Sequence, residues 1–289
     1  WSYHKYLPLL DFPDRYGKVK DVSDFCFKAQ IVSYEQYRAL QEGFNYKMWD
    51  WYTGMLVWKN QNPWTALRGF FYDYYLDYTG GYFGYMHGAA PVHIQLNLND
   101  SLVCVLNQTA RNIKNLDAEV MLYDLHGKLI FSRKNTLDLN AHDTRLLDKV
   151  ELPEGGSEVF FLKLLLSENN EVIDENIYWL TNKPKSYEKL NDLRKVELKT
   201  DVSRTGGKDA TVSVTNQENE TAFFIRLKVV DKEGNLILPA YFSESYFTLL
   251  PGDSKKIKVV LPEGQATEKS EGIRLVVEGW NTGPEEIIF

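Results

Sequence analysis

The sequence has few cysteines and no long apolar run. Its two cysteines, Cys26 and Cys104, are too few for a disulfide framework. No apolar run approaches the roughly 18–20 residues that a membrane-spanning helix needs. The chain has 33 basic and 40 acidic side chains, and its formal net charge of −7 argues against a nucleic-acid-binding surface. The 289 residues are 44% apolar and 25% charged, as in an ordinary globular protein.

Motifs of the common catalytic and metal sites are also missing. The five histidines show no metal-ligand spacing such as H-E-x-x-H, so we expect no metal and no cofactor. Residues 80–84 are rich in glycine but lack the Lys-Ser/Thr of a P-loop, and we expect them to end a helix. Cys26 falls on an apolar helix stripe and is interpreted as core. His93 lies in an alternating pattern and is expected to face outward. The residues themselves therefore indicate no catalytic group.

Aromatic residues are concentrated near the start of the chain. Residues 1–85 contain 25 of the 40 Phe, Trp and Tyr residues. Such a density has two ordinary explanations, a large packed core or a stacking surface for flat ligands such as sugars. Because the composition changes near Pro91, we predict a first domain over residues 1–90.

This first domain shows a helix–strand–helix pattern. Ser23, with acidic neighbours, is a good N-cap for a helix that we expect to end at Gly43. The apolar run at residues 54–58 has the length of a buried strand, and helical spacing resumes over residues 64–78. Helix, buried strand, polar loop and helix are typical of a parallel α/β sheet. A single strand is too little for a whole sheet, so the segment resembles the end of an α/β domain.

The rest of the chain is a repeat of strand patterns. Alternation begins at Val92, and three segments then recur in order at a nearly constant offset. They are residues 103–108 with 212–217, 124–130 with 231–237, and 152–155 with 261–264. We predict two immunoglobulin-like β-sandwich domains, over residues 91–183 and 195–289. Such domains either brace another domain or bind a carbohydrate or a protein.

The end of the predicted strand at Trp58 is the candidate binding site. In a parallel-strand barrel, the residues at the carboxyl ends of the strands line the active site. Trp58 is at that position, and Asn60 and Gln61 follow with amide donors and acceptors. A broad aromatic face beside amides suits a sugar, whose C–H face stacks while its hydroxyls form hydrogen bonds. We predict Trp58, Asn60 and Gln61 as substrate-binding residues, with a loop or core role as the alternative.

Several stretches also resemble one enzyme family. They are residues 25–30, 37–40, 52–65, 71–73, 91–95 and 178–180. In this order they resemble the C-terminal part of glycoside hydrolase family 2 enzymes. The mannosylglycoprotein endo-β-mannosidases are the most similar, and the exo-β-D-glucosaminidases are next. The resemblance implies a mixed fold, in which residues 1–90 are the C-terminal segment of a (β/α)8 barrel, with residues 54–58 as strand eight. Two immunoglobulin-like β-sandwich domains follow.

The resemblance also implies where the chemistry lies. Retaining glycosidases use two carboxyl groups about 5–5.5 Å apart, and in this family the two glutamates end barrel strands four and seven. The resemblance begins after strand seven, so both glutamates lie outside this chain, and Glu35 and Glu42 fall at non-catalytic positions. Trp58 would be a floor for the bound sugar, and residues 1–4 would lie close to the pocket. The chain, which begins with Trp1 and not Met, is then expected to be a piece or a processed product, and inactive alone.

The implied partners are a glycan substrate, either a β-mannoside or a β-glucosaminide, and the remainder of the same enzyme. No nucleic acid or membrane is expected as a partner. A periplasmic, secreted or vacuolar location would fit an enzyme that degrades glycans. The alternative is a non-catalytic carbohydrate- or protein-binding β-sandwich module, in which the aromatic front is only a packed cap.

Overall fold

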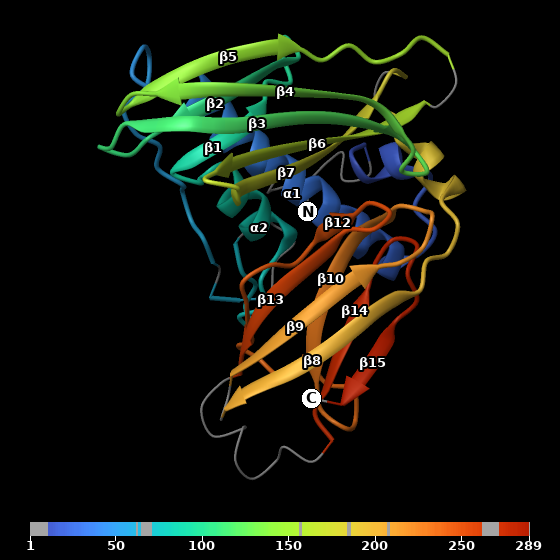
Figure 1. The fold of residues 1–289 in the computed structure, drawn as a ribbon. Coiled ribbons are helices and arrows are strands. Elements are labelled where there is room, and N and C mark those ends of the chain that lie inside the picture. Colours follow the sequence, from blue (N-terminus) through green and yellow to red (C-terminus); the bar gives the residue numbers. More distant parts are fainter. Residues whose placement is uncertain are drawn as a thin grey trace, which may run out of the picture. The chain divides into compact units, whose positions relative to one another are not determined.

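The computed structural model describes residues 11–61, 63–64, 71–155, 158–183, 186–206, 209–261 and 272–288. The chain divides into two compact units (Figure 1). The first unit contains residues 1–58 and 84–191, and the second contains residues 59–83 and 192–289. Each unit is built around a β-sandwich, and each is described by itself.

The helices of the first unit come before its strands. A short 3-10 helix, η2 (Pro13–Tyr16), leads to the long helix α1 (Val22–Tyr46). Asp21 caps α1, and its side chain accepts a hydrogen bond of 2.9 Å from the backbone N–H of Asp24. The cap therefore lies two residues before the predicted Ser23. Gly43 does not end the helix, because a glycine inside a helix costs only about 1 kcal/mol and the next turn is held by packing.

The buried face of α1 is mostly polar. Its fully buried side chains are Lys28, Ile31, Tyr34, Arg38, Gln41, Glu42 and Asn45. Cys26 is exposed, so its interpretation as a core residue was wrong. Phe25 and Phe27 are only partly buried, and the apolar residues on the buried face are Ile31 and Tyr34. Hydrogen bonds made by the polar stripe, and not an apolar stripe alone, therefore decide which side of α1 faces the unit.

Helix α2 (Gly80–Gly88) begins where the sequence predicted a helix end. Gly84 faces α1 so closely that an added Cβ would lie 2.2 Å from the carbonyl oxygen of Tyr34. At Gly88 the distance to the carbonyl oxygen of Arg38 would be 3.3 Å. Glycine is needed wherever two backbones approach this closely. Gly84 and Gly88 thus permit close contact between the two helices. The prediction that residues 80–84 end a helix was wrong, because α2 begins at Gly80.

The first β-sandwich has one sheet of three strands and one of four, all paired antiparallel. The three-stranded sheet has the order β1 (Val92–Leu96), β2 (Leu102–Asn107), β5 (Asp143–Lys149). The four-stranded sheet has the order β4 (Leu129–Leu139), β3 (Ile113–Asp124), β6 (Val159–Glu168), β7 (Glu171–Thr181). The strands predicted near residues 103, 119 and 159 are confirmed. Alternate residues such as Ile94, Leu122 and Leu162 fill the core between the sheets.

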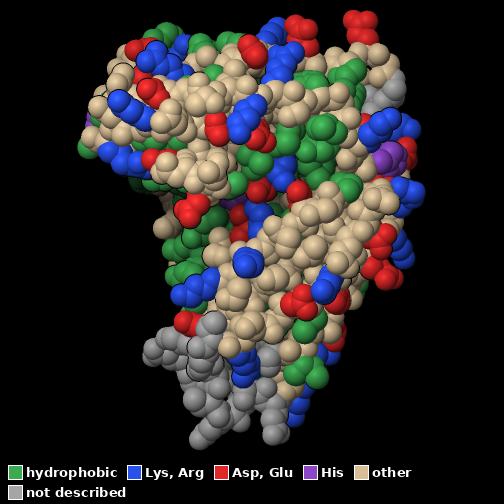
Figure 2. All heavy atoms as spheres, viewed as in Figure 1, with side chains coloured by type: hydrophobic (Ala, Val, Ile, Leu, Met, Phe, Trp, Pro, Cys, Tyr) green, Lys and Arg blue, Asp and Glu red, His purple; other side chains and the backbone are tan. Residues whose placement is uncertain are grey.

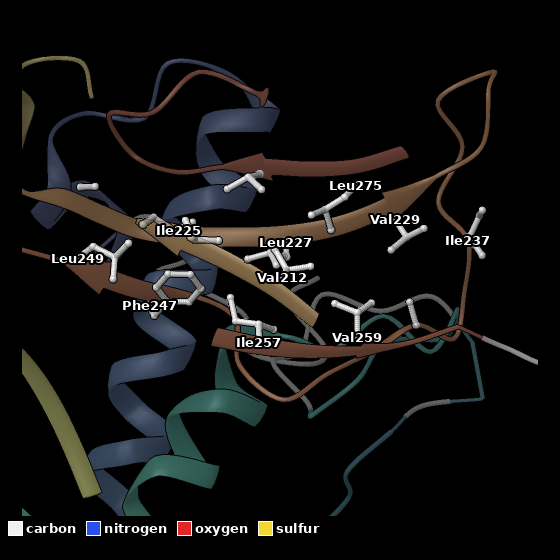
Figure 3. Close-up of a cluster of buried hydrophobic side chains, with 14 of the residues drawn as sticks. Val212, Ile225, Leu227, Val229, Ile237, Phe247, Leu249, Ile257, Val259 and Leu275 are labelled. Atoms are coloured by element: carbon white, nitrogen blue, oxygen red, sulfur yellow. The ribbon is translucent and has the colours of Figure 1, made fainter. Parts of the chain in front are cut away.

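The second β-sandwich has two sheets of four strands. One sheet has the order β11 (Tyr241–Phe242), β13 (Ser254–Val260), β9 (Asp209–Asn216), β8 (Leu198–Gly206). The other has the order β12 (Phe247–Leu249), β10 (Ala222–Val230), β14 (Arg274–Glu278), β15 (Glu285–Ile288). A 3-10 helix, η3 (Glu188–Asp192), precedes them. Figure 3 shows the core, in which Val212, Leu227 and Ile257 from three strands point toward one another.

The internal repeat is confirmed by matching hydrogen bonds in the two sandwiches. In the hairpin after β3, Asp124 Oδ1 accepts from the backbone N–H of Lys128 at 2.9 Å. In the corresponding turn after β10, Asp231 Oδ1 accepts from the backbone N–H of Asn235 at 2.8 Å. Gly127 and Gly234 have φ angles of 82° and 88°, as these turns require. Part of the third matched segment, at residues 262–264, lies outside the described residues.

The predicted strand at residues 54–58 does not form, and residues 71–78 are not helical. The side chains of Leu56 and Trp58 are 99% and 87% exposed. An apolar strand needs strands on its edges to pair its backbone groups, and no described strand lies beside it. No barrel segment is evident among the described residues, which form mostly β-sandwich with few helices.

Basic and acidic side chains are interspersed over the face shown in Figure 2. None of the described helices is long and apolar enough to cross a membrane.

Candidate functional site

Trp58 lies in an irregular segment that follows α1. Its side chain is 87% exposed, so the broad face of the indole is open to solvent. Trp58 belongs to the first unit, whereas Asn60 and Gln61 belong to the second unit, so each is described within its own unit. An exposed indole provides the apolar face that a sugar ring requires for stacking.

Asn60 and Gln61 lie beside residues 71–73 of the second unit. The backbone carbonyl of Asn60 accepts hydrogen bonds from the backbone N–H groups of Phe71 and Tyr72, at 3.2 and 3.4 Å. Gln61 Nε2 donates to the carbonyl oxygen of Asp73 at 3.4 Å. The Asn60 side chain is exposed. The backbone of this loop is therefore held in place while the Asn60 amide faces solvent. Residues 1–4, also expected near the site, lie outside the described residues.

A turn rich in aromatic residues connects α1 to the Trp58 segment. The backbone N–H of Trp49 donates to the carbonyl oxygen of Tyr52 at 2.8 Å, and that of Trp51 donates to Lys47 at 2.9 Å. Trp51 is 75% exposed, and the ring of Trp49 contacts the ring of His142 edge-on. Large exposed apolar side chains indicate a surface for a ligand or a partner where they form one contiguous patch.

The two glutamates of α1 are engaged in structural contacts. The hydroxyl of Tyr16 donates to Glu35 and accepts a hydrogen bond of 2.9 Å from Trp179 Nε1. Burial raises the pKa of Glu35 to about 7, against the opposing effects of Tyr16 and Arg38. Glu42 accepts a hydrogen bond of 2.6 Å from the hydroxyl of Tyr178. Glu42 therefore connects α1 directly to β7, and Glu35 connects it to β7 through Tyr16 of η2.

A buried polar cluster joins α1 to β1 and β7, and the sequence analysis did not predict it. His93 was expected to face outward but is fully buried, with Nδ1 2.8 Å from Asp174 Oδ2. The Gln95 amide donates to the carbonyl oxygen of Glu42 at 2.9 Å, and Asn45 donates to Gly88 at 2.7 Å. Strand β1 is buried on both faces, one against the core and one against the helix. The sequence signal for this cluster was a row of polar residues at helical spacing on α1, together with alternating polar residues on β1.

Several aromatic residues of the second unit pack around Tyr78. Its ring centroid is 4.6 Å from that of Tyr82 and 5.3 Å from that of Tyr241. Burial and the neighbouring Tyr241 hydroxyl raise the pKa of Tyr78. An ion pair between Asp77 and Arg226 holds the same segment to β10. For these residues the packing explanation of the aromatic density is confirmed.

No group of His, Cys, Asp and Glu side chains among the described residues could hold a metal ion.

Comparisons with known proteins match both sandwiches to glycosidase domains. Residues 100–185 match the family described as the mannosidase Ig/CBM-like domain, and residues 176–282 match the exo-beta-D-glucosaminidase Ig-fold domain. The mannosylglycoprotein endo-beta-mannosidase of Lilium longiflorum is 31% identical over 99% of this chain, which spans 37% of that relative. An exo-beta-D-glucosaminidase of Amycolatopsis orientalis is 28% identical over 94% of this chain and 29% of its own length.

Solved structures agree with these matches. The exo-chitosanase CsxA of Amycolatopsis orientalis superposes with a TM-score of 0.84 at 26% identity, over 96% of this chain and 36% of CsxA. A beta-D-mannosidase from Dictyoglomus thermophilum shares the fold, with a TM-score of 0.75 at 16% identity over 95% of this chain and 32% of its own. The chain spans about a third of the length of these proteins.

The fold and these matches define a pair of immunoglobulin-like β-sandwiches of the kind found in glycosidases. The chain resembles the C-terminal part of glycoside hydrolase family 2 enzymes, namely the mannosylglycoprotein endo-β-mannosidases and the exo-β-D-glucosaminidases.

Proposed function

We propose that this chain is the C-terminal part of a retaining β-glycosidase that acts on β-mannosides or β-glucosaminides in glycans. The observation that carries the proposal is the alignment of 99% of the chain, including the front segment, with the Lilium longiflorum enzyme. The domain limits proposed are residues 1–90 for the end of the barrel, and 91–183 and 195–289 for the supporting sandwiches. The parent enzyme would act through a covalent glycosyl-enzyme, with both catalytic glutamates outside this chain.

The exposed aromatic residues support a role beside the rest of the enzyme. Trp51, Leu56 and Trp58 are large apolar side chains that the chain itself leaves open to solvent. Such a surface favours a partner or a ligand, because isolated proteins rarely expose contiguous apolar patches. In the proposal, the remainder of the enzyme covers Trp51 and Leu56, while Trp58, Asn60 and Gln61 contact the sugar.

A hydrolysis assay of the chain, alone and together with the rest of the parent enzyme, tests this function. The purified chain is expected to leave p-nitrophenyl β-D-glucosaminide and p-nitrophenyl β-D-mannoside intact. Hydrolysis is expected when the preceding part of the parent enzyme is supplied, either in one polypeptide or as a second chain. Hydrolysis by the chain alone, free of contaminants, would show that catalytic carboxylates lie within it and would overturn the proposal.

Substitution of Trp58 tests the sugar site. In the parent enzyme, Trp58→Ala is expected to raise KM for the glycoside about 10-fold or more, because an aromatic stacking contact is lost. Asn60→Ala and Gln61→Ala are each expected to weaken binding roughly 2- to 10-fold, the effect of one lost hydrogen bond. Steady-state kinetics on the two p-nitrophenyl substrates measure these changes.

The matched control is Trp51→Ala, which removes an indole that is also exposed but lies outside the proposed site. It is expected to leave KM within about 2-fold of the parent value. Equal effects of the two tryptophan substitutions would indicate a general role in packing and would count against the sugar site.

A second candidate is a non-catalytic carbohydrate- or protein-binding module, favoured by the Ig/CBM-like description of the family that matches residues 100–185. Titration of the chain with mannose- or glucosamine-containing oligosaccharides separates the two. Binding that survives Trp58→Ala but is lost on deletion of residues 94–289 would favour the module.

A further inference from the structure

His93 is a fully buried imidazole with a carboxylate on each side. Its Nδ1 is 2.8 Å from Asp174 Oδ2, and its Nε2 is 3.5 Å from Glu42 Oε1. Glu42 comes from α1, Asp174 comes from β7, and His93 itself comes from β1. The imidazole therefore connects the helix to both sheets of the first sandwich.

Other hydrogen bonds fix the two carboxylates in place. Asp174 Oδ2 also accepts from the backbone N–H of Ile94 at 2.8 Å and from Asn176 Nδ2 at 3.1 Å. Glu42 Oε1 accepts from the hydroxyl of Tyr178 at 2.6 Å. Neither carboxylate can move away from His93 without breaking these bonds.

Two atoms at the centre of the cluster have no hydrogen-bond partner within the part of the chain that the structure describes. They are Glu42 Oε2 and His93 Nε2. A buried polar atom without a partner is rare and calls for a physical reason. A proton on Nε2 would turn the contact between His93 and Glu42 into a charge-assisted interaction.

The net charge of the cluster depends on His93. Glu42 and Asp174 are negative, and the guanidinium of Arg38 lies 4.0 Å from the centre of the Tyr178 ring and donates to the carbonyl oxygen of Ile177 at 2.7 Å. With a protonated His93, the positive charges of His93 and Arg38 face the carboxylates of Glu42 and Asp174, and Glu35, one turn earlier on α1, adds a further carboxylate above about pH 7. Loss of the His93 proton removes one of these positive charges from the buried cluster, which is unfavourable in a medium of low polarity.

We propose that Glu42, His93 and Asp174 form a proton-dependent latch that helps to hold α1 against the β-sandwich and weakens when His93 loses its proton. The titratable groups that act directly on His93 are Glu42 of α1 and Asp174 of β7. Arg38 of α1 and Tyr178 of β7 act on Glu42. Glu35 lies one turn earlier on α1 and acts on Arg38. The latch is independent of the proposed glycosidase activity.

The direction of the pH effect follows from the surroundings of His93. Burial lowers its pKa, but the attraction and hydrogen bonds of Asp174 and Glu42 outweigh burial and raise the pKa to about 9. In an unfolded chain the pKa is about 6.5. A group with a raised pKa in the folded state contributes its full stability below the unfolded pKa. That stability is lost as the pH rises from about 6.5 through about 9.

Hydrogen exchange of the whole 289-residue chain between pH 6 and pH 9.5 tests the latch. After correction for the intrinsic exchange rate, the protection of the α1 amides is expected to fall on the order of 100-fold between pH 6.5 and pH 9. The amides of β3 and β6 are expected to keep their protection over the same range. In His93→Gln, α1 should be less protected than in the wild-type chain below about pH 7.5, and the fall in protection between pH 7.5 and pH 9 should be absent. Glu35, whose pKa is about 7, titrates below that window.

The control is His126→Gln, in the exposed hairpin turn, which is expected to keep the wild-type pH profile. Should His93→Gln fail to fold, NMR titration of the wild-type imidazoles replaces it. A midpoint for His93 above about 7.5 supports the latch, and a midpoint at or below that value overturns it. Protection of α1 that is independent of pH in the wild-type chain also overturns it.

Discussion

Alanine at Gly84 is expected to destabilise the first unit by about 3 kcal/mol or more. The added methyl group would lie 2.2 Å from the carbonyl oxygen of Tyr34, a backbone atom that cannot rotate away. One helix would have to move, which breaks the 3.1 Å hydrogen bond between the Tyr34 hydroxyl and His87 Nδ1. The same movement weakens the 2.7 Å bond from Asn45 to the carbonyl of Gly88. Urea unfolding, followed by exchange of the α1 and α2 amides, measures the loss.

Gly43→Ala is the matched control, since it makes the same substitution within α1. Apart from its chain neighbours and the backbone of its own helix, no atom lies within 4 Å of the position that its Cβ would take. Alanine has the higher helix propensity, so this variant is expected to be more stable by about 0.5–1 kcal/mol. Opposite signs for the two variants would establish a direct backbone contact between the helices. A neutral Gly84→Ala would contradict that contact.

The sandwiches could be predicted from the sequence because their pattern is local and repeated. Alternation of apolar residues places Leu122 and Leu162 in one core, and the Asp-x-x-Gly turns at Asp124 and Asp231 form hairpins without help from distant residues. The same side-chain chemistry appears twice in one chain, so each copy supports the interpretation of the other.

The front of the chain was harder to predict because its structure depends on partners distant in sequence. His93 was expected to face solvent, since strand alternation alone cannot show that α1 covers the outer face of β1. Cys26 was expected in the core, since the helix pattern did not reveal that the buried stripe is polar. The run at residues 54–58 has the composition of a strand, but a strand also requires neighbours, and no described strand pairs with it.

For the candidate site, the sequence predicted the kind of ligand and not the arrangement of the residues around it. The residue types at Trp58, Asn60 and Gln61 indicate sugar binding, and the structure adds that the Trp58 indole and the Asn60 amide are exposed. Their arrangement around a ligand depends on groups that the sequence of this chain does not specify. The sugar site therefore stays a prediction, whereas the polar cluster of α1 is described by its contacts.

Replacement of Asn107 or Asn216 by alanine is expected to lower the free energy of unfolding of the unit that contains it by about 2–4 kcal/mol. Both side chains are fully buried at the end of an equivalent strand. Asn107 Nδ2 donates to the carbonyl oxygens of Arg111 and Asn140, both at 2.8 Å. Asn216 Nδ2 donates to those of Glu220 and Leu249, at 2.8 and 3.0 Å. Removal of either amide leaves two carbonyl groups without this donor, so the cost exceeds that of one surface hydrogen bond.

Aspartate at either position is a sharper substitution, because it keeps the shape but replaces the donor with a carboxylate oxygen that faces two carbonyl oxygens. Above the pKa of the new carboxyl group, aspartate is expected to lower the free energy of unfolding at least as much as alanine does. At low pH the loss is expected to be smaller, because a protonated carboxyl oxygen can donate a hydrogen bond. Gln217→Ala, at the exposed neighbour of Asn216, is the control and should change stability by less than about 0.5 kcal/mol. Exchange measured separately in β2 and β9 should show each loss in one unit only, because the partners of Asn107 and of Asn216 lie in different units. A loss of protection in both units from either substitution would mean that the sandwiches unfold together and would contradict two independently stabilised repeats.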